Sequence, residues 1–283
     1  MPILSNTRIW ITGASSGIGR ALALELSRRG AHLILSGRRI DALEAVAHEA
    51  GGTPLLIPFE ATDPAAVAAA VAQALAAGPV DCLINNAGVS QRSLVVDTDP
   101  AVYCTLMEVD FFAPVALTVA LLPHMIARGS GQIAIVSSLA GKIGTPLRAG
   151  YCAAKHACVG WYEALRAEVE TAHGIGVTVI LPGSVQTEVA VNALSADGSA
   201  RGTTDANIAA GMPADQAATI IADALEADAR EVVIAEGIEA QALHLRTTAP
   251  DTLFDLLAKE GARLATARTE QGPDWQPDPG KVR

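Results

Sequence analysis

The sequence predicts an α/β protein built on one doubly wound parallel sheet of about seven strands, with helices on both faces. Seven short apolar runs occur along the 283 residues, and Ala/Leu-rich segments of helical length separate them. Strands covered on both faces give continuous apolar runs, and alternation of strands with helices favours parallel pairing. Half of the residues are hydrophobic, which is enough for one large core.

The strands are predicted where the sequence has the runs RIWIT, HLILSG, PLLIPF, DCLIN, QIAIVSS, VTVILPG and EVVIA, at residues 8–12, 32–37, 54–59, 81–85, 132–138, 177–183 and 231–235. Each run is short and apolar, as expected of a buried strand. The helix after the first strand is expected to end at Gly30, because glycine commonly follows a helix. Right-handed crossovers are expected between the parallel strands.

Residues 1–268 are predicted to form a single domain, because no linker or low-complexity segment divides them. A polar tail, 269–283, is expected to be mobile. Residues 188–212 have weak periodicity and follow the sixth strand, so a lid over a site is expected there. Residues 237–268 have a helical pattern; extra core, a subunit interface and a wall of the substrate pocket are all open interpretations.

Composition narrows the classes of partner. The formal net charge of −10, without a basic block, argues against a nucleic-acid or anionic membrane surface. Four cysteines without C-x-x-C spacing are expected to be reduced packing residues of a cytoplasmic protein. The N-terminus has no signal-peptide pattern, and no uninterrupted run of about 18 apolar residues predicts a membrane span. No metal site is predicted.

The first strand runs into TGASSGIG, residues 12–19, and then into a helix. Glycines at 13, 17 and 19 allow a tight turn and close approach of a ligand. The unpaired N–H groups of the following helix attract a pyrophosphate. The spacing is G-x-x-x-G-x-G, which differs from the more general G-x-G-x-x-G.

Tyr151 and Lys155 are four residues apart in a small-residue helix, so their side chains lie on one helix face. A neighbouring ammonium favours the phenolate form of a tyrosine, which suits acid/base work on a hydroxyl or carbonyl. Taken alone, the pattern is so common that a surface tyrosine beside a solvated lysine is the better interpretation. His156 points about 100° away around the helix and is expected to be a packing or polar-edge residue.

Five motifs occur in order: TGASSGIG, NNAG at 85–88, SS at 137–138, YCAAK at 151–155 and PGSVQT at 182–187. This ordered set resembles the short-chain dehydrogenase/reductase family over about residues 8–190, and the strand pattern extends the match to about 235. More diffusely, the chain resembles the branch of hydroxysteroid and retinoid-type reductases and their bacterial relatives. The resemblance implies one Rossmann domain that binds NAD(P) across the carboxyl ends of the strands.

The resemblance also implies the catalytic residues. Tyr151 matches the family's acid/base at the substrate oxygen, and Lys155 matches the lysine that favours the phenolate and holds the nicotinamide ribose. Ser138 matches the serine that hydrogen-bonds the substrate oxygen, and the neighbouring Ser137 is the alternative, pointing the other way. Asp110 stands where the family usually has asparagine, so it keeps the main-chain carbonyl of the proton relay but not the side-chain donor.

Three groups of cofactor contacts follow from the resemblance. The phosphates are expected against Gly13, Ser15, Ser16, Gly17, Ile18 and Gly19. The adenosine is expected beside Asn85, Asn86, Ala87 and Gly88, and beside Glu60 and Ala61, which replace the usual Asp-Val/Leu pair. The nicotinamide end is expected near Tyr151, Lys155, Pro182, Gly183, Val185 and Thr187.

The end of the second strand predicts NADP(H) over NAD(H). NAD-binding proteins tend to place an acid near this point for the ribose hydroxyl. This chain has Gly37 followed by Arg38 and Arg39, and a guanidinium can bind a 2′-phosphate. Arg38 is favoured because it comes first after the strand.

The predicted function is an NADP(H)-dependent oxidoreductase that transfers a hydride between nicotinamide and an alcohol or carbonyl substrate. The apolar lid residues Val189, Val191, Ala193 and Leu194 favour an apolar substrate. The alternative from another class is a non-catalytic dinucleotide-binding regulator or scaffold on the same fold. Epimerisation or dehydration is a third interpretation. A homodimer or homotetramer is expected, with no nucleic acid or membrane as partner.

Overall fold

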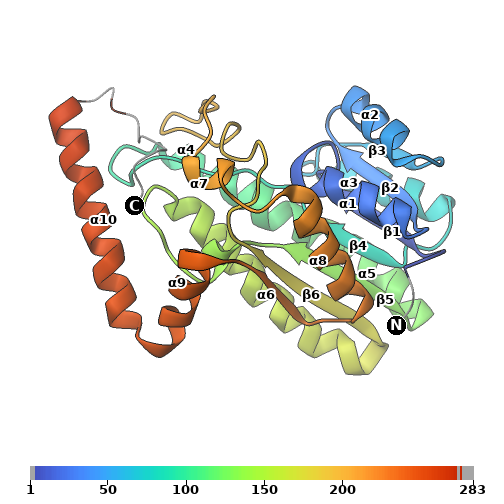
Figure 1. Cartoon of the computed structure of the whole chain (residues 1–283). Coiled ribbons are helices and arrows are strands. Elements are labelled where there is room, and N and C mark those ends of the chain that lie inside the picture. The colour runs from blue at the N-terminus through green and yellow to red at the C-terminus, as the bar shows by residue number, and fades with distance from the viewer. Residues whose placement is uncertain (1–3, 273–274, 276–283) are drawn as a thin grey trace.

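The computed structural model describes residues 4–272 and 275, and a seven-stranded parallel sheet forms its centre (Figure 1). The spatial order of the strands is β3-β2-β1-β4-β5-β6-β7. In chain order they are β1 (Arg8–Thr12), β2 (His32–Gly37), β3 (Leu55–Pro58), β4 (Cys82–Asn85), β5 (Gly131–Val136), β6 (Ile175–Pro182) and β7 (Glu231–Ile234). The predicted fold class is confirmed. The strand bounds lie close to the predicted ones: the sixth strand, for example, spans Ile175–Pro182 where 177–183 was predicted.

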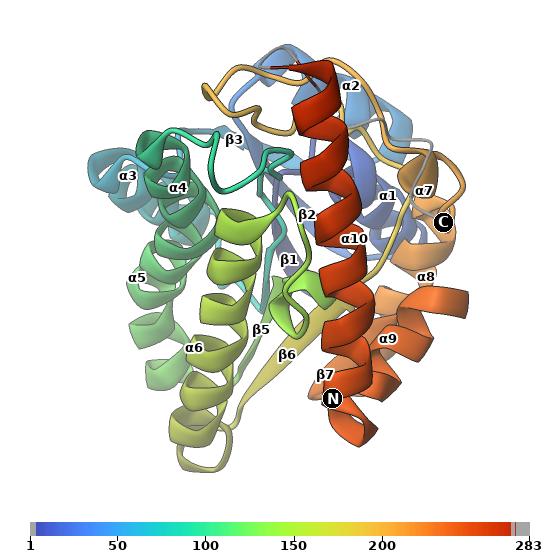
Figure 2. The same ribbon diagram turned by 90° about the vertical axis from the view of Figure 1, so that its left-hand side faces the viewer.

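Helices cover both faces of the sheet (Figure 2). One face carries α1 (Gly17–Arg28), α2 (Ile40–Ala50) and α8 (Ala214–Glu226). The other face carries α3 (Pro64–Ala76), α5 (Ala113–Arg128) and α6 (Ala149–His173). Above the carboxyl ends of the strands lie α4 (Pro100–Met107) and the short α7 (Ala206–Ala209).

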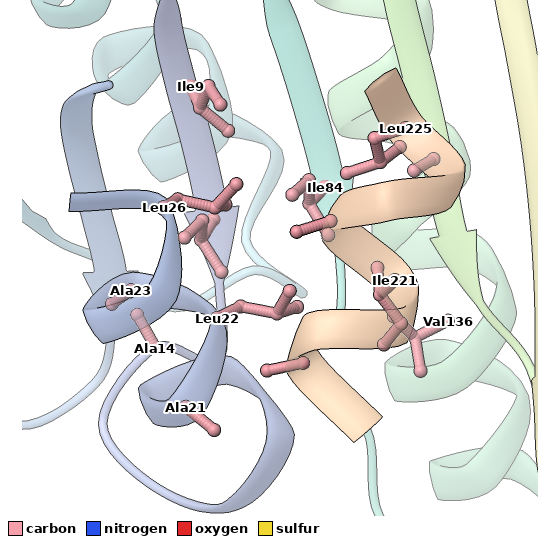
Figure 3. Close-up of a cluster of buried hydrophobic side chains, with 14 of the residues drawn as sticks. Ile9, Ala14, Ala21, Leu22, Ala23, Leu26, Ile84, Val136, Ile221 and Leu225 are labelled. Atoms are coloured by element: carbon pink, nitrogen blue, oxygen red, sulfur yellow. The ribbon is translucent and has the colours of Figure 1, made fainter. Parts of the chain in front are cut away.

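In the core on the α1 side, α1 and α8 pack side by side on the middle of the sheet (Figure 3). Leu22 and Leu26 of α1, and Ile221 and Leu225 of α8, are fully or almost fully buried there. They pack towards the central strands β1 and β4, where Ile84 is also fully buried. Burial of side chains of this size stabilises the fold by about 1.5–3 kcal/mol each. The helix that begins at the glycine-rich turn is therefore fixed on the sheet.

The order in which strands are added to the sheet reverses between β1 and β4, two parallel neighbours at the centre of the sheet. From β1 the chain builds outward through β2 and β3, and from β4 it builds outward on the other side. The hydroxyl of Thr12 ties the two strand ends together, because it accepts hydrogen bonds from the main-chain N–H groups of Asn86 at 3.0 Å and Ala87 at 3.1 Å. Ligands of open α/β sheets bind in the crevice at such a switch point.

One long helical stretch, Pro100–Arg128, has the length and apolar composition of a membrane span, with a hydropathy of 1.7. The expectation of no membrane span considered apolar runs and not the average hydropathy over a window, and it stays a prediction. Buried core helices have the same composition, and this helix supplies Leu117, Leu121 and Met125 to the core under the sheet. By itself the stretch is therefore weak support for a membrane span.

The segment after β7 forms two helices, α9 (Gly237–Thr248) and α10 (Pro250–Gln271), where a helical pattern was expected. The helix α10 stands along one side of the molecule (Figure 1). It continues three residues into the predicted tail, to Gln271, and residues 273–274 and 276–283 of that tail lie outside the described residues. All four cysteines are free thiols; Cys104 is exposed, contrary to the packing role expected of it.

Candidate active site

A cavity of about 640 Å³ opens at the glycine-rich turn between β1 and α1. Its lining residues include Ser15, Ser16 and Gly17, at the start of α1, where the first N–H groups of a helix are available to a ligand. Gly13 and Gly17 have φ angles of +64° and +53°, which side chains other than glycine rarely adopt. A turn of main-chain donors at a helix N-terminus fits a pyrophosphate, so these residues suit a dinucleotide.

Two arginines follow β2, and both are exposed. The side chain of Arg39 lines the 640 Å³ cavity together with Arg20, whereas Arg38 is not among its lining residues. The sequence favoured Arg38 as the contact of a 2′-phosphate because it comes first after the strand, but the lining of the cavity favours Arg39. The cavity therefore has cationic side chains next to the glycine-rich turn, and the choice between Arg38 and Arg39 is a matter for mutagenesis.

The end of β5 and the first turns of α6 carry the predicted catalytic side chains. The Nζ atom of Lys155 lies 5.6 Å from the centre of the Tyr151 ring and donates to Val136 O at 3.2 Å. The hydroxyl of Ser138 donates to Pro182 O at 3.3 Å, at the end of the neighbouring strand β6. Ser137 is buried, and its hydroxyl donates to the main-chain oxygen of Lys155 at 3.0 Å, so it holds α6 against β5.

The opposite direction of the two serines agrees with strand alternation and leaves Ser138 as the partly exposed one. His156 is exposed, and its Nδ1 lies 2.8 Å from Cys152 O, so its ring lies along its own helix. Tyr151 is partly exposed, as a group that meets a substrate must be. The structure thus brings Lys155 close to Tyr151 and places Ser138 at the end of β5; the catalytic roles of the three residues stay a prediction.

Asp110 lies in a π-helical turn, Glu108–Phe112, that joins α4 to α5. Its side chain is fully buried, and its Oδ1 accepts from the main-chain N–H of Val89 at 2.8 Å. Among the described residues, its Oδ2 has no hydrogen-bond partner. A Cβ atom at Gly88 would lie 2.8 Å from Asp110 Oδ1 and 3.3 Å from Lys155 Nζ, so both charged groups border the same glycine.

Burial and charge act on this pair in opposite directions. Burial raises the pKa of Asp110 to about 6, although the Lys155 charge and the Val89 hydrogen bond both lower it. Burial alone would lower the pKa of Lys155, but Asp110 and Tyr151 outweigh it and raise that pKa. Asp110 is therefore ionised at alkaline pH, where it strengthens the ammonium form of Lys155. The main-chain oxygen of Asp110, expected in a proton relay, accepts from the thiol of Cys158 at 3.0 Å.

We expect Asp110→Asn to keep kcat within about tenfold of the wild type, because the main-chain carbonyl and the Val89 hydrogen bond are both retained. The variant removes a negative charge that is present above about pH 6. A negative charge near a phenol disfavours its phenolate form. The alkaline-rising limb of alcohol oxidation should then move to lower pH. The measurement is kcat/KM for alcohol oxidation from mildly acidic to alkaline pH. A folded, cofactor-binding but inactive variant would mean that the carboxylate itself takes part in catalysis.

The two asparagines of the NNAG segment point in different directions, one into the core and the other to the glycine-rich turn. Asn85 is buried and donates to Thr118 at 2.9 Å and to Tyr162 at 3.0 Å, on the face of the sheet that carries α5 and α6. The amide of Asn86 instead donates to the main-chain oxygens of Thr12 and Gly13, at 3.1 and 3.2 Å. Only the second side chain supports the cofactor cavity; an adenosine contact of Asn85 could come only from its main chain.

Of two further predicted contacts, Thr187 lines the cavity and Glu60 is not among its lining residues. Glu60 is exposed, and its carboxylate accepts from the hydroxyl of Thr62 at 3.0 Å, in the turn that leads to α3. Thr187 lines the cavity, and a Cβ atom at Gly17 would lie 3.0 Å from its methyl group. The segment after β6 therefore reaches from the serine to the glycine-rich turn, as the nicotinamide contacts predicted there require.

A buried ion cluster holds part of the predicted lid, and sequence analysis missed it. Asp205 pairs with Arg92 and Arg201, two arginine side chains that are 3% exposed. Burial lowers the pKa of Arg92 to about 10, against the raising effect of Asp205. Two main-chain hydrogen bonds reinforce this contact: Leu194 N donates to Ser90 O at 2.8 Å, and Arg92 N donates to Leu194 O at 2.9 Å. Residues 188–212 are thus attached to the loop after β4; that they move as a lid stays a prediction.

The parallel sheet, the glycine-rich turn at its switch point and the Ser-Tyr-Lys group define a dinucleotide-binding oxidoreductase. The sequence model of the short chain dehydrogenase family matches residues 7–198. The chain therefore belongs to the short-chain dehydrogenase/reductase family, and the predicted family is confirmed.

The relatives agree with this assignment. The chain is 41% identical to mouse (Mus musculus) dehydrogenase/reductase SDR family member 7B, over 92% of this chain and 83% of that protein. Its fold is similar to a short-chain dehydrogenase/reductase from Burkholderia phymatum in complex with NAD, with a TM-score of 0.78, 24% identity and coverage of 89% and 96%. It is also similar to a short chain dehydrogenase from Burkholderia cenocepacia in complex with NADP, with a TM-score of 0.76, 24% identity and coverage of 90% and 99%.

Proposed function

We propose that the protein is an NADP(H)-dependent oxidoreductase that interconverts an alcohol and a carbonyl on an apolar small molecule. The observation that carries the proposal is the Ser138, Tyr151 and Lys155 group at the carboxyl ends of β5 and β6. The cofactor preference is supported by the arginine side chains beside the glycine-rich turn. Relatives of the same fold carry NAD in one case and NADP in another, so the preference depends on this chain's own residues.

Each residue of the group has a distinct task in this reaction. A bound nicotinamide supplies or accepts the hydride. The Tyr151 hydroxyl gives a proton to the substrate oxygen during carbonyl reduction, and the phenolate takes it back during alcohol oxidation. With substrate bound, the Ser138 hydroxyl turns away from Pro182 O and donates its hydrogen bond to the same substrate oxygen, which orients that oxygen. The Lys155 ammonium, 3% exposed and close to the ring of Tyr151, favours the phenolate.

A second cavity supports an apolar substrate. It measures about 340 Å³ and lies beside the first turn of α6, where Ala149 is two residues before Tyr151. Its walls are mostly apolar and include Leu94, Val96, Pro146 and Leu147. Apolar walls near a few polar reacting groups are typical of sites for small apolar ligands. The substrate is therefore expected to place its carbonyl at Tyr151 and its apolar body along these loops.

The test is turnover of NADPH with apolar ketones and aldehydes of increasing size, and of NADP+ with the matching alcohols. We expect kcat/KM to rise as apolar groups are added, and small polar carbonyl compounds to be poor substrates. Tight NADPH binding without turnover of any member would favour a non-catalytic dinucleotide-binding protein instead.

We also propose that the chain works as a homodimer or homotetramer in the cytoplasm. The exposed face of the long helical stretch carries Phe112, at 48%, and Val119, at 54%, which a second copy would cover. Light scattering of the purified protein tests the assembly; a monomer at micromolar concentration would contradict it.

A further inference from the structure

Glu239, in the first turn of α9, accepts hydrogen bonds from the chain that follows β6. Its Oε2 accepts from the main-chain N–H of Ser184 at 2.8 Å, and its Oε1 accepts from the Ser184 hydroxyl at 2.7 Å. A Cβ atom at Gly183 would lie 2.0 Å from Glu239 Oε2, so the carboxylate lies directly against the main chain. Hydrogen bonds to a carboxylate are shorter and stronger than those between neutral groups.

The residues that Glu239 contacts belong to a segment, Pro182 to Thr187, that borders the proposed cofactor site along its length. At one end, Pro182 O accepts from the Ser138 hydroxyl. At the other end, Thr187 lines the cavity of the glycine-rich turn. The reacting end of a dinucleotide must lie next to the serine and tyrosine, and its pyrophosphate next to the glycines. Ser184 is therefore beside the nicotinamide half.

Other main-chain bonds hold the opposite side of this segment. Ser184 O accepts from Met212 N at 3.0 Å, and Gln186 N donates to Met212 O at 2.9 Å. Gly183 N donates to Ile234 O at 2.8 Å, at the end of β7. The N–H and hydroxyl of Ser184 are the groups left to Glu239. The carboxylate thus completes the attachment of the segment and fixes the direction of the Gly183–Ser184 peptide.

The same contact holds α9 in its position beside the segment after β6. No residue of α9 is fully buried, and Leu243 packs only partly against the core. Burial of apolar surface by α9 is small, so the hydrogen bonds that Glu239 accepts from Ser184 are a specific attachment of the C-terminal extension to the site. Sequence analysis left the role of this extension open.

We propose that Glu239 is a positioning residue for the nicotinamide half of the cofactor, acting through Ser184. The proposal rests on the proposed function, because it assumes that a dinucleotide binds along this segment. Removing the carboxylate should loosen the nicotinamide half and leave the adenine half in place. A residue needed only for overall folding would instead weaken both halves together.

The experiment measures the dissociation constants of the dinucleotide that the wild type prefers and of its adenine half alone. The half ligand is 2′,5′-ADP for NADPH, or ADP for NADH. Glu239→Ala should weaken dinucleotide binding by about fivefold or more, with the half ligand changed by less than about twofold. Glu239→Gln should give a smaller loss, since its amide oxygen still accepts from the Ser184 N–H. KM for the cofactor should rise in parallel.

The matched control is Glu236→Gln, three residues earlier, which removes the same charge from an exposed side chain that makes no capping hydrogen bond. It should leave both dissociation constants unchanged. Equal weakening of both ligands by Glu239→Ala, or no change in either, would overturn the proposal. Binding of the half ligand also reports that each variant is folded. A wild type that binds neither dinucleotide would instead defeat the proposed function, so the two failures are distinguishable.

Discussion

Tyr151→Phe should abolish most turnover while leaving cofactor affinity close to that of the wild type. The change removes the oxygen that exchanges a proton with the substrate and almost no volume from α6. General acid/base groups contribute about 10²–10⁴-fold, so kcat should fall by that factor. The loss should be in kcat and kcat/KM alike, because the interaction is made in the transition state. Steady-state kinetics of carbonyl reduction at neutral pH measure it.

Tyr103→Phe is the matched control for this variant. Tyr103 lies on α4, and its hydroxyl has no hydrogen-bond partner among the described residues, so loss of that oxygen should leave kcat unchanged. Retention of more than about a tenth of wild-type kcat by Tyr151→Phe would remove Tyr151 from the role of acid/base, since such groups contribute at least about a hundredfold.

Removal of the arginines after β2 should abolish a preference for NADPH over NADH. A hydrogen bond to a charged group is worth about 1.5–3 kcal/mol, so the preference in kcat/KM should be about tenfold or more. Arg38→Ala tests the choice made from chain position, and Arg39→Ala tests the choice made from the cavity wall. We expect the effective variant to lose activity with NADPH and to keep its activity with NADH.

The control for the arginine variants is Arg28→Ala, which removes a side chain that is 71% exposed at the far end of α1. It should leave the ratio of the two kcat/KM values unchanged. Similar ratios in the wild type and in the Arg38→Ala, Arg39→Ala double variant would show that neither guanidinium contacts a 2′-phosphate.

The sheet and the central residues of the site were predictable because they depend on local spacing. Apolar runs gave the strands, and the spacing of four placed Tyr151 and Lys155 on one face. Alternation also accounts for Asn85: its neighbour Ile84 packs on the α1 face, so Asn85 must face α5 and α6. The direction of Asn85 therefore follows from the alternation of side chains along a strand, which the sequence alone contains.

Other features depend on contacts between distant segments or on backbone details. Glu239 and Ser184 are 55 residues apart, and Arg92 and Asp205 are 113 apart, with no motif that connects either pair. The π-helical turn around Asp110 adds a residue to one turn, which a helical pattern does not reveal. Whether Arg38 or Arg39 faces the cavity depends on the main-chain angles at the start of α2, where Arg39 is extended.

The most direct test of hydride transfer uses NADPH labelled with deuterium at C4 of the nicotinamide, in both epimers, with a pool of apolar ketones and aldehydes. Mass spectrometry of the alcohols then shows where the label goes. We predict one deuterium on the carbinol carbon from one epimer and none from the other, and labelled product formed about 10²–10⁴-fold more slowly with Tyr151→Phe. Alcohols that are unlabelled with both epimers, or no alcohol from either epimer with a protein that binds NADPH tightly, would contradict the account.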